Sequence, residues 1–268
     1  MNGVATQPRT FDPLGRFALL AFAGAWGIEL LLLAAGVRFE GPTAAIWLIL
    51  VSVIPGAAGV AAAKLDPSPD ALEDLVRRIR TWRVGLGSYG LAVGLPLVTV
   101  IASVAGSMVL GIEITPQPEI LTAIPVILAA NFAEETGWRG FVLPVLLRRM
   151  GALRASLLLG VIWFTWHVPV QLLIPGEDKL LALLAMLLQL TGLSILLTWL
   201  SIHGRKAVIL AAAAHASFNV AGNGLALLDV EGQLILGIAC LVLAAAVLAI
   251  GGPELMRPAL AAPTTPEE

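Results

Sequence analysis

The chain has 268 residues, of which 58% are hydrophobic and only 13% are charged. Soluble domains carry about 25% charged residues, so this composition excludes an ordinary soluble domain, and the wealth of apolar side chains excludes a disordered chain. A formal charge of −2 offers no basic face for nucleic acid, and a lone cysteine, Cys240, excludes an internal disulfide and a thiolate metal cluster. The sequence therefore indicates a polytopic membrane protein.

Eight windows of 20 or more residues contain few or no ionised side chains, and each is long enough to cross about 30 Å of hydrocarbon. Their apolar residues do not alternate with polar ones as barrel strands would, which predicts helices. The predicted fold class is all-α, with about eight transmembrane helices in a membrane domain over residues 17–252. The windows are 17–37, 43–63, 85–111, 120–147, 155–174, 180–202, 207–228 and 233–252.

Three segments lie outside these windows. Residues 1–16 are polar and predict a cytoplasmic segment, because they lack the apolar core of a cleaved signal peptide. Residues 70–83 have leucines on one helical face and arginines on the other, which predicts either an amphipathic helix on the inner membrane surface or an ordinary basic loop helix. Residues 253–268 predict a disordered cytoplasmic tail, since they are rich in proline and small residues.

The basic residues are distributed unevenly between the two sides of the predicted bundle. With a cytoplasmic N-terminus, 13 of the 16 lysines and arginines lie inside, Arg38 and Lys179 lie outside, and Arg139 falls within a span. The positive-inside rule therefore predicts that both termini are cytoplasmic. The alanine- and leucine-rich composition is typical of a bacterial chain, so we expect a bacterial cell membrane with lipid as a partner.

The fourth window contains three charged residues where charge is costly. Glu135 and Arg139 are four residues apart, so they share one helix face and are predicted to pair. Glu134 lies about 100° round the helix from its neighbour, outside that pair, and is predicted to face another element. A helix-packing salt bridge accounts well for Glu135 and Arg139 and poorly for Glu134.

Two further windows carry isolated polar residues. His167 lies in the fifth window, while His215 and Asn219, four residues apart, share one face of the seventh. Taken singly, each is commonly a hydrogen-bonded packing residue. Counting the helical rise from the inner boundaries places Glu134, His167 and His215 at depths of about 12–20 Å, in one slab of the membrane. This shared depth predicts a single site.

A carboxylate, two imidazoles and an amide support two forms of amide hydrolysis. Glu134, His167, His215 and Asn219 are candidate ligands of Zn²⁺, which would lower the pKa of a bound water and polarise a carbonyl. Without metal, Glu134 and His167 would activate water as general bases, and the other two would stabilise the oxyanion. The sequence contains no His-Glu-x-x-His run to decide between them.

Three motifs in this order resemble the CPBP family, which comprises type II CAAX prenyl endopeptidases and bacterial relatives linked to bacteriocin processing and self-immunity, also called Abi proteins. They are Glu-Glu-x-x-x-Arg at 134–139, aromatic-x-x-x-His at 163–167 and His-x-x-x-Asn at 215–219, within residues 131–223. The arginine-rich stretch 77–89 is similar to the segment that precedes the core in bacterial members. The second motif departs from the usual family pattern, because Trp163 replaces phenylalanine.

The resemblance implies an intramembrane endopeptidase, metal-dependent or glutamate-dependent, with its site inside the bundle and a protease core at about 120–228. Carried over by position, Glu134 would be the water-activating carboxylate, with Glu135 and Arg139 as its support. The metal-binding or oxyanion-stabilising residues would be His167, His215 and Asn219. The implied substrate is a membrane-associated peptide or protein, and the resemblance does not assign prenylation to it.

Two other classes of function use similar residues. A non-catalytic membrane scaffold or bacteriocin-immunity protein would use the same cavity for binding. An ion-coupled transporter also uses buried carboxylates and histidines, but it predicts repeated halves, which the sequence does not contain. The intact set of reactive residues favours the endopeptidase. Glu29, the one charge in the first window, receives no role, and the sequence assigns no oligomeric state.

Overall fold

The computed structural model describes residues 12–36, 41–174, 178–225 and 229–251. Within these ranges the chain is helical and contains no β-strand. The elements in chain order are α1 (Pro13–Ala34), α2 (Gly41–Lys64), α3 (Ala71–Arg80), α4 (Leu86–Leu110), η1 (Pro118–Ala123), α5 (Ile124–Glu135), η2 (Thr136–Val142), α6 (Leu143–Arg149), α7 (Ala152–Leu173), α8 (Lys179–His203), α9 (Val208–Phe218), η3 (Asn219–Leu225) and α10 (Val230–Gly251).

Five of the described helices are long and apolar enough to cross a membrane, namely α1, α4, α7, α8 and α10. Two further windows contain shorter apolar stretches, Ile49–Lys64 and Val208–Gly222. The window predicted at 120–147 is divided among η1, α5, η2 and α6. The chain is thus an all-α polytopic membrane protein, as predicted, whereas the count of eight spans stays a prediction.

The bundle has apolar side chains on its outside and polar side chains within. Leu31, Val109 and Ile250 are exposed on α1, α4 and α10, as suits surfaces that meet lipid. The charged groups of the fourth predicted span are buried instead, which is the usual arrangement for ionisable residues at membrane depth. The core that positions the polar motifs therefore lies inside the bundle.

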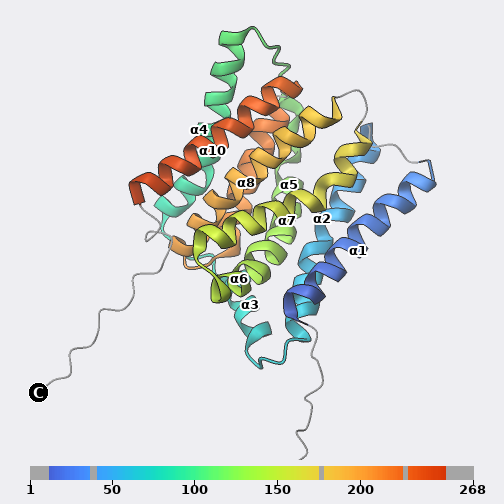
Figure 1. Ribbon diagram of the computed structural model, residues 1–268, viewed down its shortest axis with the longest axis vertical. Helices are drawn as coiled ribbons and strands as arrows, with labels where there is room; N and C mark the ends of the chain where they lie inside the picture. The colour runs from blue at the N-terminus through green and yellow to red at the C-terminus, as the bar shows by residue number, and fades with distance from the viewer. Residues whose placement is uncertain (1–11, 37–40, 175–177, 226–228, 252–268) are drawn as a thin grey trace, which may run out of the picture.

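Helix α5 lies in the middle of the bundle, with α1 and α2 on one side and α4 and α10 on the other (Figure 1). Glycine allows α2 to approach α5 and η2 backbone to backbone. A Cβ atom on Gly137 would overlap the Pro55 carbonyl oxygen, and one on Gly56 would lie 2.5 Å from that of Ala133. Small residues at such crossings are typical of membrane helices.

Segments that were predicted to lie on the cytoplasmic side contact one another at one end of the bundle. Asp12, just before α1, forms an ion pair with Arg149 at the end of α6. Arg205 donates to the carbonyl of Arg83 at 3.3 Å, which joins the turn after α8 to the segment after α3. These contacts agree with the predicted grouping of segments, while the side of the membrane on which they lie stays a prediction.

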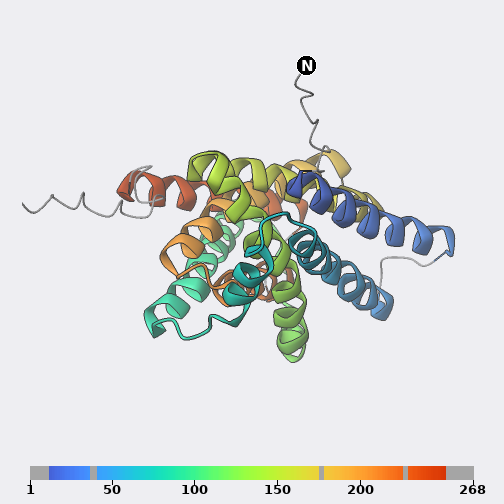
Figure 2. The same ribbon diagram turned by 90° about the horizontal axis from the view of Figure 1, so that it is seen from below.

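Helix α3 lies across the same end of the bundle, in front of it when seen from below (Figure 2). It occupies the segment predicted to form an amphipathic helix at 70–83. Leu75 is buried, and Arg78 donates to the carbonyl of Gly140 in η2 at 2.9 Å. Burial lowers the pKa of the Arg78 guanidinium, against the opposing effect of Asp74. The predicted tail at 253–268 lies outside the described residues, as does most of the segment 1–16.

Candidate active site

Two helices change to π-helical geometry at the positions of the polar motifs. Helix α5 ends at Glu135, where η2 begins, and α9 ends at Phe218, where η3 begins. A π-turn closes its hydrogen bonds from i to i+5, so it shifts side chains relative to α-helical spacing, and it is frequent at functional sites. The α-helical spacing assumed for residues 134–139 and 215–219 therefore holds only for the first part of each motif.

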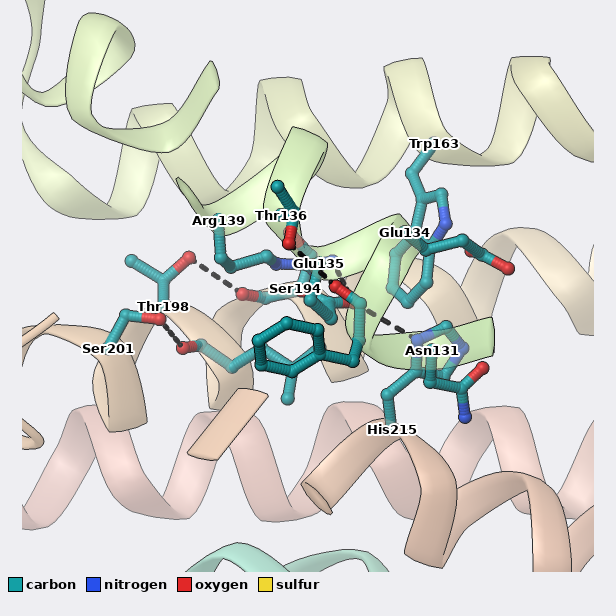
Figure 3. Close-up of polar contacts among 12 residues, drawn as sticks. Asn131, Glu134, Glu135, Thr136, Arg139, Trp163, Ser194, Thr198, Ser201 and His215 are labelled. Atoms are coloured by element: carbon teal, nitrogen blue, oxygen red, sulfur yellow. Dashed lines mark hydrogen bonds and ion pairs between the residues drawn. The ribbon is translucent and has the colours of Figure 1, made fainter. Parts of the chain in front are cut away.

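Glu135 is the centre of a buried charge cluster. Its Oε1 accepts from Arg139 Nη1 at 2.9 Å and lies 3.1 Å from His215 Nδ1 (Figure 3). The Glu135 and Arg139 side chains are 0% and 1% exposed, so neither charge is screened by water. The ion pair predicted from the i, i+4 spacing is confirmed. His215 adds a third member from α9, which local spacing cannot predict.

Glu134 has a different set of neighbours. Its carboxylate points away from Glu135, Arg139 and His215 (Figure 3). One oxygen, Oε1, accepts from the hydroxyl of Ser52 on α2 at 2.8 Å, which confirms that Glu134 faces another element. The other oxygen, Oε2, is buried without a hydrogen-bond partner. Oε2 of Glu135 is also without a partner, so what distinguishes Glu134 from its neighbour is that its carboxylate forms no ion pair within the described residues.

His167 on α7 is held by its own helix. Its Nδ1 lies 2.9 Å from the carbonyl oxygen of Trp163, which can only accept, so Nδ1 carries the proton and Nε2 is the nitrogen left for other contacts. The ring packs edge-on against the Trp166 indole, with 4.7 Å between centroids. His167 also lies within electrostatic range of Glu134 and His215.

Asn219 reaches the site from the first residue of η3. Its Nδ2 donates to Oδ1 of Asn131 at 3.3 Å. Asn131 is buried in α5, one turn before the two glutamates, and is a site residue that the sequence analysis missed. The available signal was the lone amide side chain of Asn131 in an apolar stretch, three residues before Glu134 and therefore on a neighbouring part of the same helix face.

The Trp163 indole joins the three motifs. The guanidinium carbon of Arg139 lies 4.3 Å from the ring centroid, in cation–π geometry. The imidazole of His215 packs edge-on at 4.9 Å, and that of His167 at 5.9 Å. The predicted convergence of these motifs is therefore present, with a tryptophan between them. Glu29 is buried in α1 and takes no part in the contacts described above.

Known proteins are similar to the part of the chain that contains the motifs. Residues 116–221 match the family described as type II CAAX prenyl endopeptidase Rce1-like, and this stretch includes all three polar motifs. The protein "CAAX prenyl protease 2" of Methanococcus maripaludis is 31% identical over 128 residues, 46% of this chain. Over these residues the chain is similar to CAAX proteases. The match spans 47% of that relative, so the chain covers about half of its length.

The six predicted site residues all lie in the part of the chain that matches the CAAX protease family. The structure brings Glu135, Arg139 and His215 into direct contact. Glu134 is close enough to His167 for its charge to act on the imidazole. Asn219 is linked to the site through its hydrogen bond to Asn131. Ser52 lies outside the matched residues, on α2.

The zinc predicted for a CAAX-protease-like site can be compared with the donors present. Two histidines and a glutamate match the ligand type of catalytic zinc, and each imidazole has its Nδ1 held by an acceptor, as metal-bound histidines do. Within the described residues, however, no three His, Cys, Asp or Glu side chains are grouped closely enough to hold a metal ion. The ligand chemistry fits zinc and the spacing does not, so zinc stays a prediction.

Proposed function

We propose that the chain is an intramembrane endopeptidase that hydrolyses a peptide bond of a membrane-associated peptide or protein. The observation that carries this proposal is the state of Glu134, a buried carboxylate that forms no ion pair within the described residues, with one oxygen held by Ser52 and the other without a partner. The Glu135–Arg139 pair next to it supplies fixed charge, and the family relationship supplies the class of reaction.

The proposed step begins with a water molecule between Glu134 Oε2 and His167 Nε2. Glu134 accepts a proton from this water while the water oxygen attacks the carbonyl carbon of the substrate. A C–O bond forms, and the carbonyl oxygen becomes an oxyanion. Glu134 then gives the proton to the departing nitrogen as the C–N bond breaks. The products are a carboxylic acid and an amine, and the carboxylate of Glu134 is restored.

His215 and Asn219 are the proposed stabilisers of the oxyanion. Donors that are fixed before the reaction stabilise a developing charge without reorganisation, and they act more strongly in a site that excludes water. Glu135 accepts from Nδ1 of His215, so the ring would donate to the oxyanion from Nε2 when that nitrogen carries a second proton, and Asn131 fixes the direction of the Asn219 amide. The supporting residues therefore act by orienting the donors.

The Glu134→Gln substitution tests this proposal. The purified full-length protein would be assayed with a quenched-fluorescence peptide that ends in a prenylated Cys-aliphatic-aliphatic-X sequence, and with its unprenylated counterpart. We expect kcat to fall by about 10²–10⁴-fold, since glutamine cannot accept the proton. Glu29→Gln is the matched control, because it neutralises another buried carboxylate in a different helix.

The same pair of variants separates catalysis from binding. A non-catalytic scaffold or immunity protein would retain its binding or protection in the Glu134→Gln variant, because the amide has the same size as the carboxylate. Turnover that is unchanged in Glu134→Gln would remove the endopeptidase proposal. Comparison of the two peptides would show whether the prenyl group contributes to recognition, as the name of the curated relative suggests.

Metal dependence is tested separately. Because the described donors are not grouped as ligands, we propose direct activation of water by Glu134 as the primary mechanism. We expect activity to survive a zinc chelator, and metal analysis of the purified protein to find less than stoichiometric zinc. Stoichiometric zinc that is lost together with activity would instead support the metal-dependent form, with Glu134, His167 and His215 as ligands.

The location of the protein is also a proposal. The positive-inside distribution supports a cell-membrane protein with both termini in the cytoplasm. Labelling of single introduced cysteines in intact cells with a membrane-impermeant reagent would test this. Residues near Asp12 and Arg149 should be protected together, because these two residues form an ion pair.

A further inference from the structure

Ser52 is the only partner that the described residues give to a carboxylate oxygen of Glu134. Its hydroxyl donates to Oε1 at 2.8 Å, across 82 residues of sequence. The Ser52 side chain is buried, with 5% of the residue exposed. It lies on α2, outside the residues 116–221 that match the family, so neither the sequence motifs nor the match assigns it a role.

The position of the Ser52 hydroxyl is set by backbone packing. Gly56 follows Ser52 by one helical turn, and a Cβ atom there would lie 2.5 Å from the carbonyl oxygen of Ala133, the residue before Glu134. On the other side of Glu134, a Cβ atom on Gly137 would overlap the Pro55 carbonyl oxygen. The two close approaches flank the hydrogen bond and bring the backbone of α2 against those of α5 and η2 on both sides of Glu134.

A single hydrogen bond to Oε1 has a definite effect on a carboxylate. It favours one rotamer of the side chain and directs the lone pairs of Oε2 away from the serine. Oε2 is the oxygen that is buried without a partner, and the carboxylate that carries it points away from the Glu135 cluster (Figure 3). A catalytic base needs such support, because a small misplacement of the group costs much of its rate.

We propose that Ser52 is a positioning residue, which fixes Glu134 so that Oε2 is presented to the attacking water. The inference rests on the proposed endopeptidase function. It implies that the catalytic centre is completed by α2 and is not contained within the residues that match the family. The predicted protease core at about 120–228 would then be insufficient for full activity without α2.

The test compares Ser52→Ala with Ser52→Thr in the purified full-length protein, using the prenylated peptide probe. We expect Ser52→Ala to lower kcat by about 10–100-fold, as loss of an orienting partner typically does, and to leave KM close to its wild-type value. Ser52→Thr keeps the hydroxyl donor and should recover most of kcat. A general packing defect would not be rescued by a larger side chain.

Ser103→Ala is the matched control. Ser103 is also a buried serine of a membrane helix, and it donates to the carbonyl of Gly232 at 3.1 Å, in the contact between α4 and α10. We expect this variant to lose one buried hydrogen bond and to keep the wild-type kcat. An equal loss of kcat in Ser103→Ala and Ser52→Ala would overturn the inference, because the effect would then be one of stability.

Two outcomes distinguish failure of this inference from failure of the proposed function. If Glu134→Gln is inactive while Ser52→Ala keeps the wild-type kcat, Ser52 does not position the base and the endopeptidase proposal stands. If Glu134→Gln is fully active, both proposals fail together. Thermal unfolding of each variant would show whether the protein is folded under the assay conditions.

Discussion

Glu134 and Glu135 are adjacent in one helix and both are buried, yet their surroundings differ in kind. Glu135 is paired with Arg139 and contacts His215, so its charge is balanced within 3.1 Å. In both residues Oε2 is buried without a hydrogen-bond partner, so they differ at Oε1, which in Glu134 accepts from the Ser52 hydroxyl and forms no ion pair within the described residues. Because the two residues share helix, depth and chemistry, the difference arises from the elements that face them, α9 for Glu135 and α2 for Glu134.

This contrast distinguishes a structural role for Glu135 from a role in the reaction for Glu134. A buried carboxylate whose charge is balanced by an ion pair is held in place by that pair. A buried carboxylate without a counter-charge is costly to keep, and such a cost is typical of a group that acts on a ligand. We therefore expect the Glu135 side of the site to determine stability, and the Glu134 side to determine rate.

The largest expected difference is in stability. Glu135→Ala leaves Arg139 buried without its counter-charge, which should lower the free energy of unfolding by about 3–5 kcal/mol. Glu134→Ala removes no ion pair and should cost clearly less. Denaturant unfolding of both variants in the same detergent measures the difference. Equal losses in the two variants would mean that the two carboxylates have equivalent structural roles.

A double substitution sharpens this result. Glu135→Leu with Arg139→Met removes both charges and keeps apolar volume, so it should recover most of the stability lost in Glu135→Ala. Its peptide cleavage should stay low, because His215 loses the acceptor that orients its ring. A double variant that is stable and also fully active would show that the buried pair has no part in orienting His215.

Asn131 should have a smaller effect, confined to rate. Asn131→Ala removes the acceptor that directs the Asn219 amide, so kcat should fall by roughly 10-fold, near the lower end for loss of an orienting partner. Gln189→Leu is a suitable control, since Gln189 is another buried amide, which donates to Gln233 between α8 and α10. A comparable loss of rate in the control would contradict an orienting role for Asn131.

The parts of the site that follow from local spacing were predictable. The Glu135–Arg139 pair needs only two side chains on consecutive turns, and it is present at 2.9 Å although η2 begins between the two residues. The predicted windows also coincide with helical segments of the chain. These predictions succeed because hydrophobic length and helical period are properties of short stretches.

The contacts between helices were not predictable from spacing. Ser52 is one of several serines in apolar helices, where such residues commonly serve only in packing, and nothing near it in sequence relates it to Glu134. The change to π-helix at Thr136 and Asn219 was also missed, because the apolar pattern of these segments is compatible with an uninterrupted α-helix. Both features depend on which helices pack together.

The smallest effect is expected for the same ion-pair chemistry at the surface. Asp12 and Arg149 are about half exposed, at 48% and 45%, whereas the buried pair is fully enclosed. The hydrogen bond from Arg149 holds the pKa of Asp12 below its ordinary value of 3.8. The pair therefore contributes stability above about pH 4, and that contribution is lost as the pH falls through the lowered pKa.

Asp12→Asn should lower the free energy of unfolding at neutral pH by only about 0.2–1 kcal/mol, since solvent and salt screen an exposed pair. The difference from wild type should shrink further in high salt, and it should vanish in acid once Asp12 is protonated. Thermal unfolding at neutral and acidic pH, with and without added salt, measures this. A loss as large as that of Glu135→Ala would show that burial is not what separates the two ion pairs.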